Sequence, residues 1–483
     1  MKQERAVFGF KAGYWAALLM ELFERWAFYG IFALIAIYME SPQSKGGLGF
    51  SSEDRGAIQG VVTFLIYFLP VLTGSIADRF GFRRVLLVAF VILGVGYYSM
   101  GKVTEYSALF AVFAMVGVGA ALFKPVIVGT VSLNTTSSND TVGFGIFYMV
   151  VNIGGFVGPF VASKMRDVNW DYVFLTSAAV IGINLILLFT LYKGNRNAVK
   201  IKREKFSKEL TLVFVNMYKA FLNYRFLLFV IIMSGFWMMY WQIFFTLPVY
   251  IAQWIDTTTI YNSAKWIAYT FGNNEGGINP EMLQNLGAAT IVLFQVVVSN
   301  LIKRVRPLTS ILFGILLSSL AMVVMSFGVN GWIIIIAIVF FTFGEMVSSP
   351  RTQEFVGRIA PKEMIGVYMG YSFLPVAFGS LAGGFLSGRL TARISDLYSR
   401  AIDELIKRGY TDTHTILRMD KEDQLSITME RLGMDRTELI HYLYETYQPY
   451  TIWWYFGAIG LLTVLGFLLY NTFVMPSKEK NKA

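Results

Sequence analysis

The chain has 483 residues, of which 55% are hydrophobic and only 15% are charged. Soluble proteins carry roughly 25% charged residues, so this composition favours a membrane protein that crosses the bilayer many times. The formal net charge of +10 does not indicate nucleic-acid binding, because the basic residues gather in short segments between apolar runs. The absence of cysteine excludes disulfides and thiol chemistry.

Twelve apolar runs are long enough to cross a bilayer, for which about twenty residues suffice. They fall into two sets of six, which predicts an all-α membrane protein built from two six-helix bundles. The N-terminal bundle is expected over 1–194, a cytoplasmic linker over 195–225 and the C-terminal bundle over 226–483. The expected spans are 14–39, 57–77, 83–101, 106–131, 141–165, 171–192, 226–252, 284–302, 307–327, 331–356, 363–390 and 449–475.

The segment between the two sets is strongly basic, with seven Lys or Arg residues and one acidic residue in 193–208. Short basic loops stay on the cytoplasmic side of a membrane. We therefore expect the linker, the loop 303–306 and the tail 478–482 in the cytoplasm, with both termini inside the plasma (inner) membrane. The polar N-terminus has no small-residue cleavage site, so we expect the first span to be retained.

Two polar segments, 253–283 and 391–447, interrupt the apolar pattern of the second half. The longer one holds eleven acidic and eight basic residues and both histidines of the chain, His414 and His441. Its apolar spacing indicates short amphipathic helices. We expect an extracytoplasmic insert that forms a solvated cap, and a pH sensor built on the histidines is the alternative.

The first apolar run carries three charged residues, Glu21, Glu24 and Arg25. A charge near the middle of a bilayer costs a few kcal/mol even on lenient insertion scales, so it is kept for pairing or for function. At positions i, i+3 and i+4 the three side chains share one helix face. This spacing predicts a site that handles protons and anions beside a water-filled path, and a structural ion cluster is the alternative.

Four motifs follow one another on or beside the spans. Asp78, Arg79 and Arg83 belong to one of them and provide a charged latch that can break as helices move. The motifs are Glu21-x-x-Glu24-Arg25-x-x-x-Tyr29-Gly30, the segment GSIADRFGFRR at 74–84, Phe147-Tyr148-x-x-x-Asn152-Ile153-Gly154 and Gly344-Glu345-x-x-x-Ser349-Pro350.

The segment 74–84 resembles the loop signature of the major facilitator superfamily. The other three motifs resemble signatures of the proton-dependent oligopeptide transporters within that superfamily, and they occur in the right order on the right spans. The resemblance covers most of the chain outside the polar insert. It implies two bundles that rock about a substrate site near the middle of the membrane.

The resemblance also implies roles for individual residues. Arg25 would bind the carboxylate of a peptide, and Glu21 and Glu24 would couple protonation to that binding. Glu345 would take part in proton coupling, face the peptide amine and pair with Lys124. The residues expected to line the substrate pocket with Arg25, Lys124 and Glu345 are Tyr29, Tyr67, Tyr148, Asn152 and Trp241.

Simpler interpretations stand beside these roles. Tyr67 and Tyr148 can be ordinary helix-packing residues, and the segment that begins at Asn152 can mark only a close helix crossing. Glu345 can be a structural partner of Lys124 alone.

Many members of the resembled family have an arginine on the first span and an acidic residue on the seventh, whereas this chain has Phe32 and Trp241. We predict that these two aromatic side chains form the outer gate in place of a salt bridge. Buried aromatic area can supply such a closing contact. Phe32 and Trp241 should therefore meet on the outer side when the protein opens inward.

The sequence thus predicts a transporter and not an enzyme, one that performs proton-coupled symport of short peptides by alternating access. We find no metal-ligand cluster and expect no cofactor, with protons as the coupling ion. The expected partners are a small-molecule substrate and the lipid bilayer, the chain acting as a monomer. One alternative is a family offshoot that carries an organic anion, an amino-acid conjugate or a drug. Another is a membrane receptor or scaffold that uses the outer insert.

Overall fold

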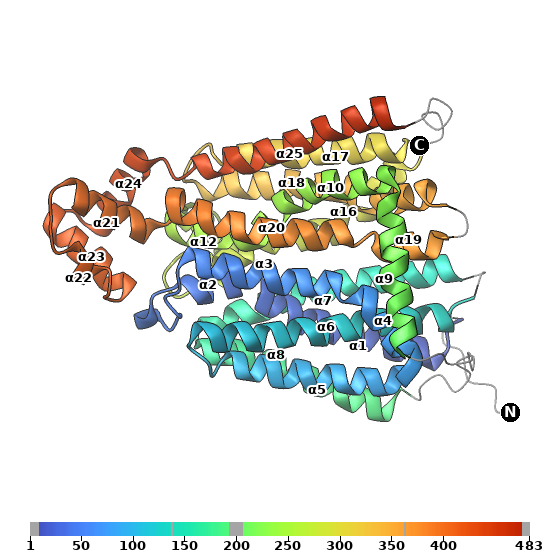
Figure 1. The fold of residues 1–483 in the computed structure, drawn as a ribbon. Helices are drawn as coiled ribbons and strands as arrows, with labels where there is room; N and C mark the ends of the chain where they lie inside the picture. The colour runs from blue at the N-terminus through green and yellow to red at the C-terminus, as the bar shows by residue number, and fades with distance from the viewer. Residues whose placement is uncertain (1–8, 137–138, 193–205, 362–363, 476–483) are drawn as a thin grey trace.

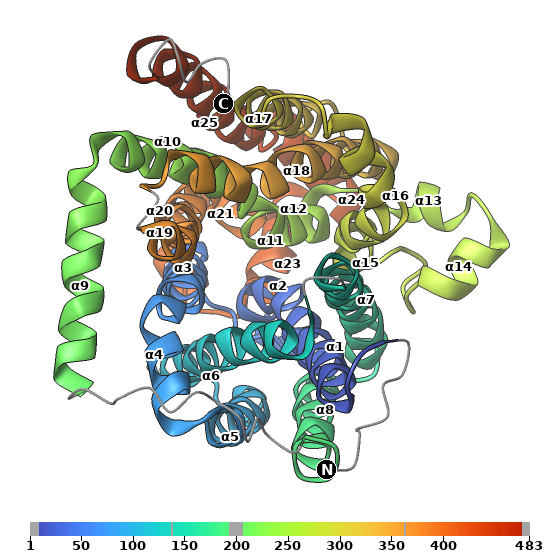
Figure 2. The same ribbon diagram turned by 90° about the vertical axis from the view of Figure 1, so that its right-hand side faces the viewer.

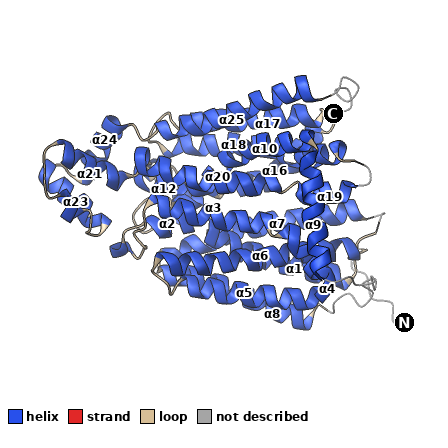
Figure 3. Ribbon diagram, viewed as in Figure 1, coloured by secondary structure: helices blue, strands red, loops and turns tan. Residues whose placement is uncertain are grey.

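The computed structural model describes residues 9–136, 139–192, 206–361 and 364–475. In these ranges the fold is built from helices and turns without a strand, as Figure 3 shows. Twelve helical segments are long and apolar enough to cross a membrane, beginning with Ala12–Glu40 and ending with Pro449–Val474. The predicted all-α class with about twelve spans is therefore confirmed.

The N-terminal half supplies six of the spans, two of which are each made of two helices in sequence. Its elements are α1 (Ala12–Phe32), α2 (Ile35–Glu40), η1 (Gln43–Lys45), α3 (Ser52–Phe68), α4 (Pro70–Phe80), α5 (Phe82–Met100), α6 (Tyr106–Asn134), α7 (Asp140–Arg166) and α8 (Trp170–Thr190). The break between α3 and α4 falls at Pro70, because proline has no N–H to donate and is best accommodated in the first turn of a helix.

The C-terminal half supplies the other six spans. Its elements up to the insert are α10 (Tyr224–Tyr240), α11 (Gln242–Phe245), α12 (Leu247–Trp254), α13 (Thr258–Tyr261), α14 (Lys265–Phe271), α15 (Pro280–Gln284), α16 (Leu286–Ile302), α17 (Pro307–Val324), α18 (Gly331–Ile359), α19 (Ile365–Tyr371), α20 (Leu374–Leu390) and η3 (Thr391–Ser395). After the insert follow α25 (Thr451–Leu469) and η4 (Tyr470–Val474).

The two halves lie side by side with their spans roughly parallel (Figures 1 and 2). They meet most extensively where α3 packs along α20, and also where α7 packs along α16. Glycines allow the first of these contacts. A Cβ on Gly60 would lie 3.1 Å from the Cα of Gly384, and one on Gly388 would lie 2.8 Å from the carbonyl oxygen of Ser52. Small residues permit this close approach of two spans.

The polar insert contains four helices, α21 (Leu397–Lys407), α22 (Thr413–Ile416), α23 (Lys421–Leu432) and α24 (Arg436–Tyr447). It projects from one end of the bundle, which we call the insert end (Figure 1). His414 and His441 are both exposed there. The insert begins about five residues later than the predicted residue 391, because η3 continues the eleventh span through the buried Thr391 and Ser395.

The opposite end, which we call the linker end, holds the start of α1 and the end of η4 (Figure 1). Helix α9 (Phe206–Leu222) lies here and runs across the ends of the spans (Figures 1 and 2). The Tyr371 hydroxyl donates a 3.0 Å hydrogen bond to the carbonyl oxygen of Val213 and so holds α9 against α19. The earlier part of the predicted linker, 193–205, lies outside the described residues.

Candidate functional site

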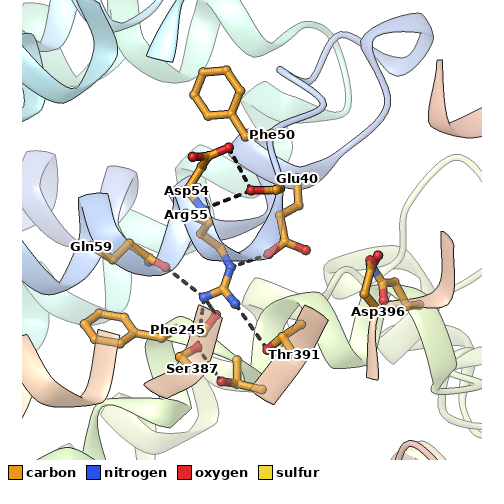
Figure 4. Close-up of polar contacts among 12 residues, drawn as sticks. Glu40, Phe50, Asp54, Arg55, Gln59, Phe245, Ser387, Thr391 and Asp396 are labelled. Carbon is orange, nitrogen blue, oxygen red and sulfur yellow. Dashed lines mark hydrogen bonds and ion pairs between the residues drawn. The ribbon is translucent and has the colours of Figure 1, made fainter. Parts of the chain in front are cut away.

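The two halves are closed against each other at the insert end by a buried arginine (Figure 4). Arg55 of α3 is fully buried and forms an ion pair with Glu40 of α2. Its guanidinium also donates hydrogen bonds to the carbonyl oxygen of Phe245 at 2.5 Å, the Ser387 hydroxyl at 3.1 Å and the Thr391 hydroxyl at 3.3 Å. These three acceptors belong to the C-terminal half, so one side chain of the N-terminal half joins both halves.

The insert makes a second connection between the halves. Asp420 accepts hydrogen bonds from the backbone N–H of Gln43 at 2.7 Å and from the Ser44 hydroxyl at 2.8 Å. Lys421 donates to the carbonyl oxygens of Glu40 and Phe50 at 3.0 and 2.8 Å. The insert belongs to the C-terminal half, whereas residues 40–50 belong to the N-terminal half. It therefore straps the two halves together at the insert end.

The electrostatics of this strap depend on carboxylates outside the spans. Burial alone raises the pKa of Asp420, but hydrogen bonds from the backbone of Glu422 and from Ser44 outweigh burial and hold that pKa below its usual range. Burial also raises the pKa of Glu422, but hydrogen bonds from Arg436 and Lys45 outweigh burial. The pKa of Glu422 therefore lies below its usual range as well. Hydrogen bonding to the ionised form is the cause in both cases.

The predicted aromatic contact is present just inside this closure. The rings of Phe32 and Trp241 meet edge to face, with centroids 5.6 Å apart and an interplanar angle of 68°. Both side chains are buried. Trp241, which the sequence predicts both at the gate and in the pocket, packs against Phe32 and Tyr67 and is not part of the cavity wall. Its gating role stays a prediction.

The charged residues of the first span form one buried cluster. Arg25 contacts Glu24 at 2.5 Å and Glu21 at 3.5 Å, and all three side chains are more than nine-tenths buried. Lys124 lies within electrostatic range of this cluster, and its ammonium sits 4.8 Å from the centre of the Tyr67 ring. With both carboxylates ionised, the two cations balance the two anions, which lowers the cost of holding the charges away from water.

A cavity lies between the halves, with about 910 Å³ of non-protein space including its opening. Among the predicted site residues, Tyr29, Tyr148, Asn152 and Glu345 line it, while Glu21, Glu24, Arg25, Tyr67 and Lys124 do not. Tyr29 links the two regions, because the Arg25 guanidinium lies 5.8 Å from the centre of its ring. The structure thus connects the ion cluster to the cavity wall through Tyr29. The full lining is Tyr29, Ala33, Tyr148, Val151, Asn152, Gly155, Pro159, Tyr240, Ile243, Phe244, Gln284, Asn285, Gly287, Ala288, Ile291, Ile338, Phe341, Thr342 and Glu345.

Glu345 has a different partner from the predicted one. The Tyr240 hydroxyl donates a 2.9 Å hydrogen bond to the Glu345 carboxylate, and among the described residues Glu345 makes no ion pair with Lys124 or with any other cation. The sequence reasoning missed Tyr240, although it lies in the aromatic run just before Trp241. It also missed Gln284 and Asn285, whose signal was two consecutive amides at the start of the eighth span.

The predicted charged latch lies near the linker end, where α4 ends and α5 begins. Gly81 separates the two helices with φ of +88°, a conformation that favours glycine. The side chain of Asp78 lies outside the described part of the structure. Arg83 is exposed, and its guanidinium lies 5.9 Å from the centre of the Phe189 ring. The latch formed by Asp78, Arg79 and Arg83 stays a prediction.

Comparison with known proteins supports this architecture. The family model described as Major Facilitator Superfamily matches residues 15–384. The chain is similar to a Di-/tripeptide transporter of Lactococcus lactis subsp. lactis (strain IL1403), with 28% identity over 210 residues, 42% of this chain and 42% of that protein. The chain thus spans less than half the length of this relative. It is also similar to a Na(+), Li(+), K(+)/H(+) antiporter of Planococcus maritimus, with 24% identity over 380 residues, 75% of this chain and 86% of that protein.

Solved structures give the same picture for the fold. The chain is similar to a POT family transporter in complex with 5-aminolevulinic acid, with a TM-score of 0.71, 18% identity and coverage of 97% of each chain. At this low identity the likeness concerns the fold alone, and the coverage shows that it extends over both halves.

Proposed function

Because this chain belongs to the Major Facilitator Superfamily, we propose that it is a secondary active transporter that carries short peptides together with protons by alternating access. The observation that carries the proposal is the ion cluster beside the cavity. Two carboxylates and a guanidinium are buried together within a membrane span, where charges are kept for pairing or for function. Tyr29 both lines the cavity and lies beside the Arg25 guanidinium.

The proposed cycle uses the exchange of partners around Arg25. When Glu24 or Glu21 takes a proton, it no longer neutralises Arg25, and the guanidinium becomes available to a substrate carboxylate. A planar guanidinium suits this task because it can hold a carboxylate with two parallel hydrogen bonds. Deprotonation on the other side returns Arg25 to its glutamates and expels the substrate. Because the three groups interact closely, their titration belongs to the cluster as a whole.

The cavity suits a substrate with charges at both ends. Arg25, beside the Tyr29 wall of the cavity, can attract the carboxylate of a substrate. Glu345, whose described partner is the neutral Tyr240, can bind the amine of a substrate through its own carboxylate. A short peptide carries both groups. The ligand named for one structural neighbour, 5-aminolevulinic acid, also carries an amine and a carboxylate, and the Lactococcus relative is named as a di-/tripeptide transporter.

The insert end is the closed end of the molecule in this structure. We propose that the chain works as a monomer in the plasma (inner) membrane. In this orientation the insert end is extracytoplasmic, and both termini and α9 are on the cytoplasmic side. The basic linker that precedes α9 supports this orientation. Labelling of single cysteines with a membrane-impermeant reagent tests the orientation, because the native chain has no cysteine. Light scattering of the purified protein tests the oligomeric state.

Uptake into proteoliposomes tests the function. Labelled di- and tripeptides should accumulate when the outside is more acidic than the inside, and the accumulation should vanish when a protonophore removes the gradient. Counterflow without a gradient should persist. If no peptide exchanges, symport of peptides is wrong, and if no solute of any class exchanges, the receptor or scaffold alternative replaces transport.

A second candidate function is antiport of a monovalent cation against protons. The extent of sequence likeness favours it. The Planococcus antiporter resembles this chain over both halves, whereas the likeness to the Lactococcus peptide transporter covers 42% of the chain. The same proteoliposomes distinguish the two functions. Antiport of K⁺ or Na⁺ releases internal protons when the cation is added outside, whereas peptide symport carries protons inward with the peptide.

A further inference from the structure

Gln284 is a buried amide on the wall of the central cavity that the proposed cycle does not use. Its side chain is 6% exposed, and neither its nitrogen nor its oxygen has a hydrogen-bond partner within the described part of the chain. Buried amides left unpaired are rare, and each such group in a native structure calls for an explanation. Because Gln284 lines the cavity, the missing partner can come from whatever the cavity holds.

The position of Gln284 sets it at the closed end of the cavity. Just outside it, Glu281 of α15 pairs with Arg166 of α7 at 2.8 Å, and Asn279 donates to Asp167 at 2.8 Å. The next residue, Asn285, donates to the carbonyl oxygen of Phe156 at 2.8 Å. These three contacts fix this part of the eighth span against α7 of the other half. Gln284 is therefore presented by a rigid element.

Three other polar side chains on the cavity wall have hydrogen-bond partners among the described residues. Asn152 donates to the carbonyl oxygen of Tyr148 within its own helix, Thr342 donates to that of Ile338, and Glu345 accepts from Tyr240. Gln284 differs because both its donor and its acceptor remain unused. The last torsion of a glutamine side chain is soft, so the amide can reorient at little cost to meet a partner.

We propose that Gln284 forms a subsite that recognises the neutral amide group of the substrate. A primary amide offers one acceptor and two donors, so it can receive the N–H of a peptide bond and donate to its carbonyl oxygen. This pairing is independent of the charges at the substrate's ends, which Arg25 and Glu345 handle in the proposed function. The inference rests on that function, because it assigns Gln284 to the peptide bond in the middle of the same substrate.

The test compares alanyl-alanine with its ester analogue, in which oxygen replaces the peptide nitrogen. The ester lacks the N–H and is a weaker acceptor. Both are offered to proteoliposomes containing the wild-type chain, Gln284→Met, Gln284→Asn or the control Gln295→Met. Gln295 lies on α16, which continues the same eighth span, and it donates a hydrogen bond to Ser299 and does not line the cavity. Methionine matches the length of glutamine but offers no comparable hydrogen bond.

In the wild type and in Gln295→Met, the KM for the ester should exceed that for the peptide by about tenfold, the worth of one hydrogen bond. In Gln284→Met this ratio should fall to within about twofold through a higher KM for the peptide, and Gln284→Asn should lie between. The melting temperature of ligand-free Gln284→Met should not fall, because an unpaired buried amide is removed.

A tenfold ratio that survives in Gln284→Met overturns the subsite while leaving peptide transport intact. Equal losses for peptide and ester together with a lower melting temperature show a structural role and overturn it as well. A wild-type chain that transports neither compound contradicts the proposed function itself, and the subsite with it.

Discussion

Replacing Arg55 with methionine should open the insert end of the molecule. Arg55 is the fully buried side chain that pairs with Glu40 in its own half and donates to three acceptors in the other half. Methionine keeps much of the apolar volume but none of these bonds. When the halves separate, Glu40 can meet water, whereas in the closed state it would stay buried without a cation.

The size of the effect follows from the burial. Removing one partner of a buried ion pair costs about 3–5 kcal/mol, because the other charge is left uncompensated. This cost applies to the closed state alone, since water can solvate Glu40 once the halves part. With about 1.4 kcal/mol for each factor of ten, the closed-to-open equilibrium should shift roughly 100- to 4,000-fold toward the open state.

Pulsed electron paramagnetic resonance can measure the shift, because the chain has no native cysteine to interfere with spin labelling. Labels at Thr104→Cys and Thr446→Cys report on exposed positions of the N-terminal half and of the insert. Arg55→Met should broaden and lengthen the distance distribution. Arg408→Met is the matched control, because Arg408 pairs with Glu404 within the insert and this ion pair does not connect the two halves.

The double variant Arg55→Met with Glu40→Gln separates the causes. It removes the unpaired charge, so most of the shift should disappear even though the bonds to the C-terminal half stay broken. A distance distribution for Arg55→Met that equals the wild type, or an equal change in Arg408→Met, would refute the reasoning.

Four further predictions concern transport and the strap. Arg25→Ala should abolish peptide counterflow while the protein remains monodisperse in size-exclusion chromatography, because the substrate carboxylate loses its guanidinium; wild-type uptake would contradict this. Glu21→Gln or Glu24→Gln should abolish accumulation driven by a pH gradient but leave exchange measurable, and if both variants still concentrate substrate, Glu345 is the next candidate for the proton carrier. Deleting most of 396–447 and joining the flanks with a short linker should leave counterflow measurable, since the insert projects from the bundle; its complete loss in a well-folded deletion would assign the insert to substrate capture or gating. Finally, the strap should weaken as the pH falls below about 4, because the pKa values of Asp420 and Glu422 are lowered when docked, and docking is therefore favoured above their ordinary pKa values and lost as they protonate. Hydrogen exchange of residues 43–50 measures this, with Asp420→Asn expected to exchange fast already at neutral pH.

The sequence alone was enough for the spans, because the signals involved are local. About twenty apolar residues must accompany each crossing of a bilayer, and the twelve expected runs all correspond to helices of the structure. The cluster of Glu21, Glu24 and Arg25 was also accessible, since residues three and four apart share a helix face. The contact of Phe32 with Trp241 was expected from the family resemblance, because the two residues replace an arginine and an acidic residue that many members carry there.

Only the tertiary structure decided which distant groups meet. The choice of Tyr240 over Lys124 as the partner of Glu345 depends on how α10 and α6 rotate about their axes, which the apolar pattern of a span leaves open. The bonds from Arg55 to Ser387 and Thr391 join positions more than 300 residues apart, and they exist because glycines bring α3 close to α20. The strap from Asp420 to residues 43 and 44, and the unpaired amide of Gln284, likewise arise from how the two halves pack, because a polar group's partner is set by its neighbours in space.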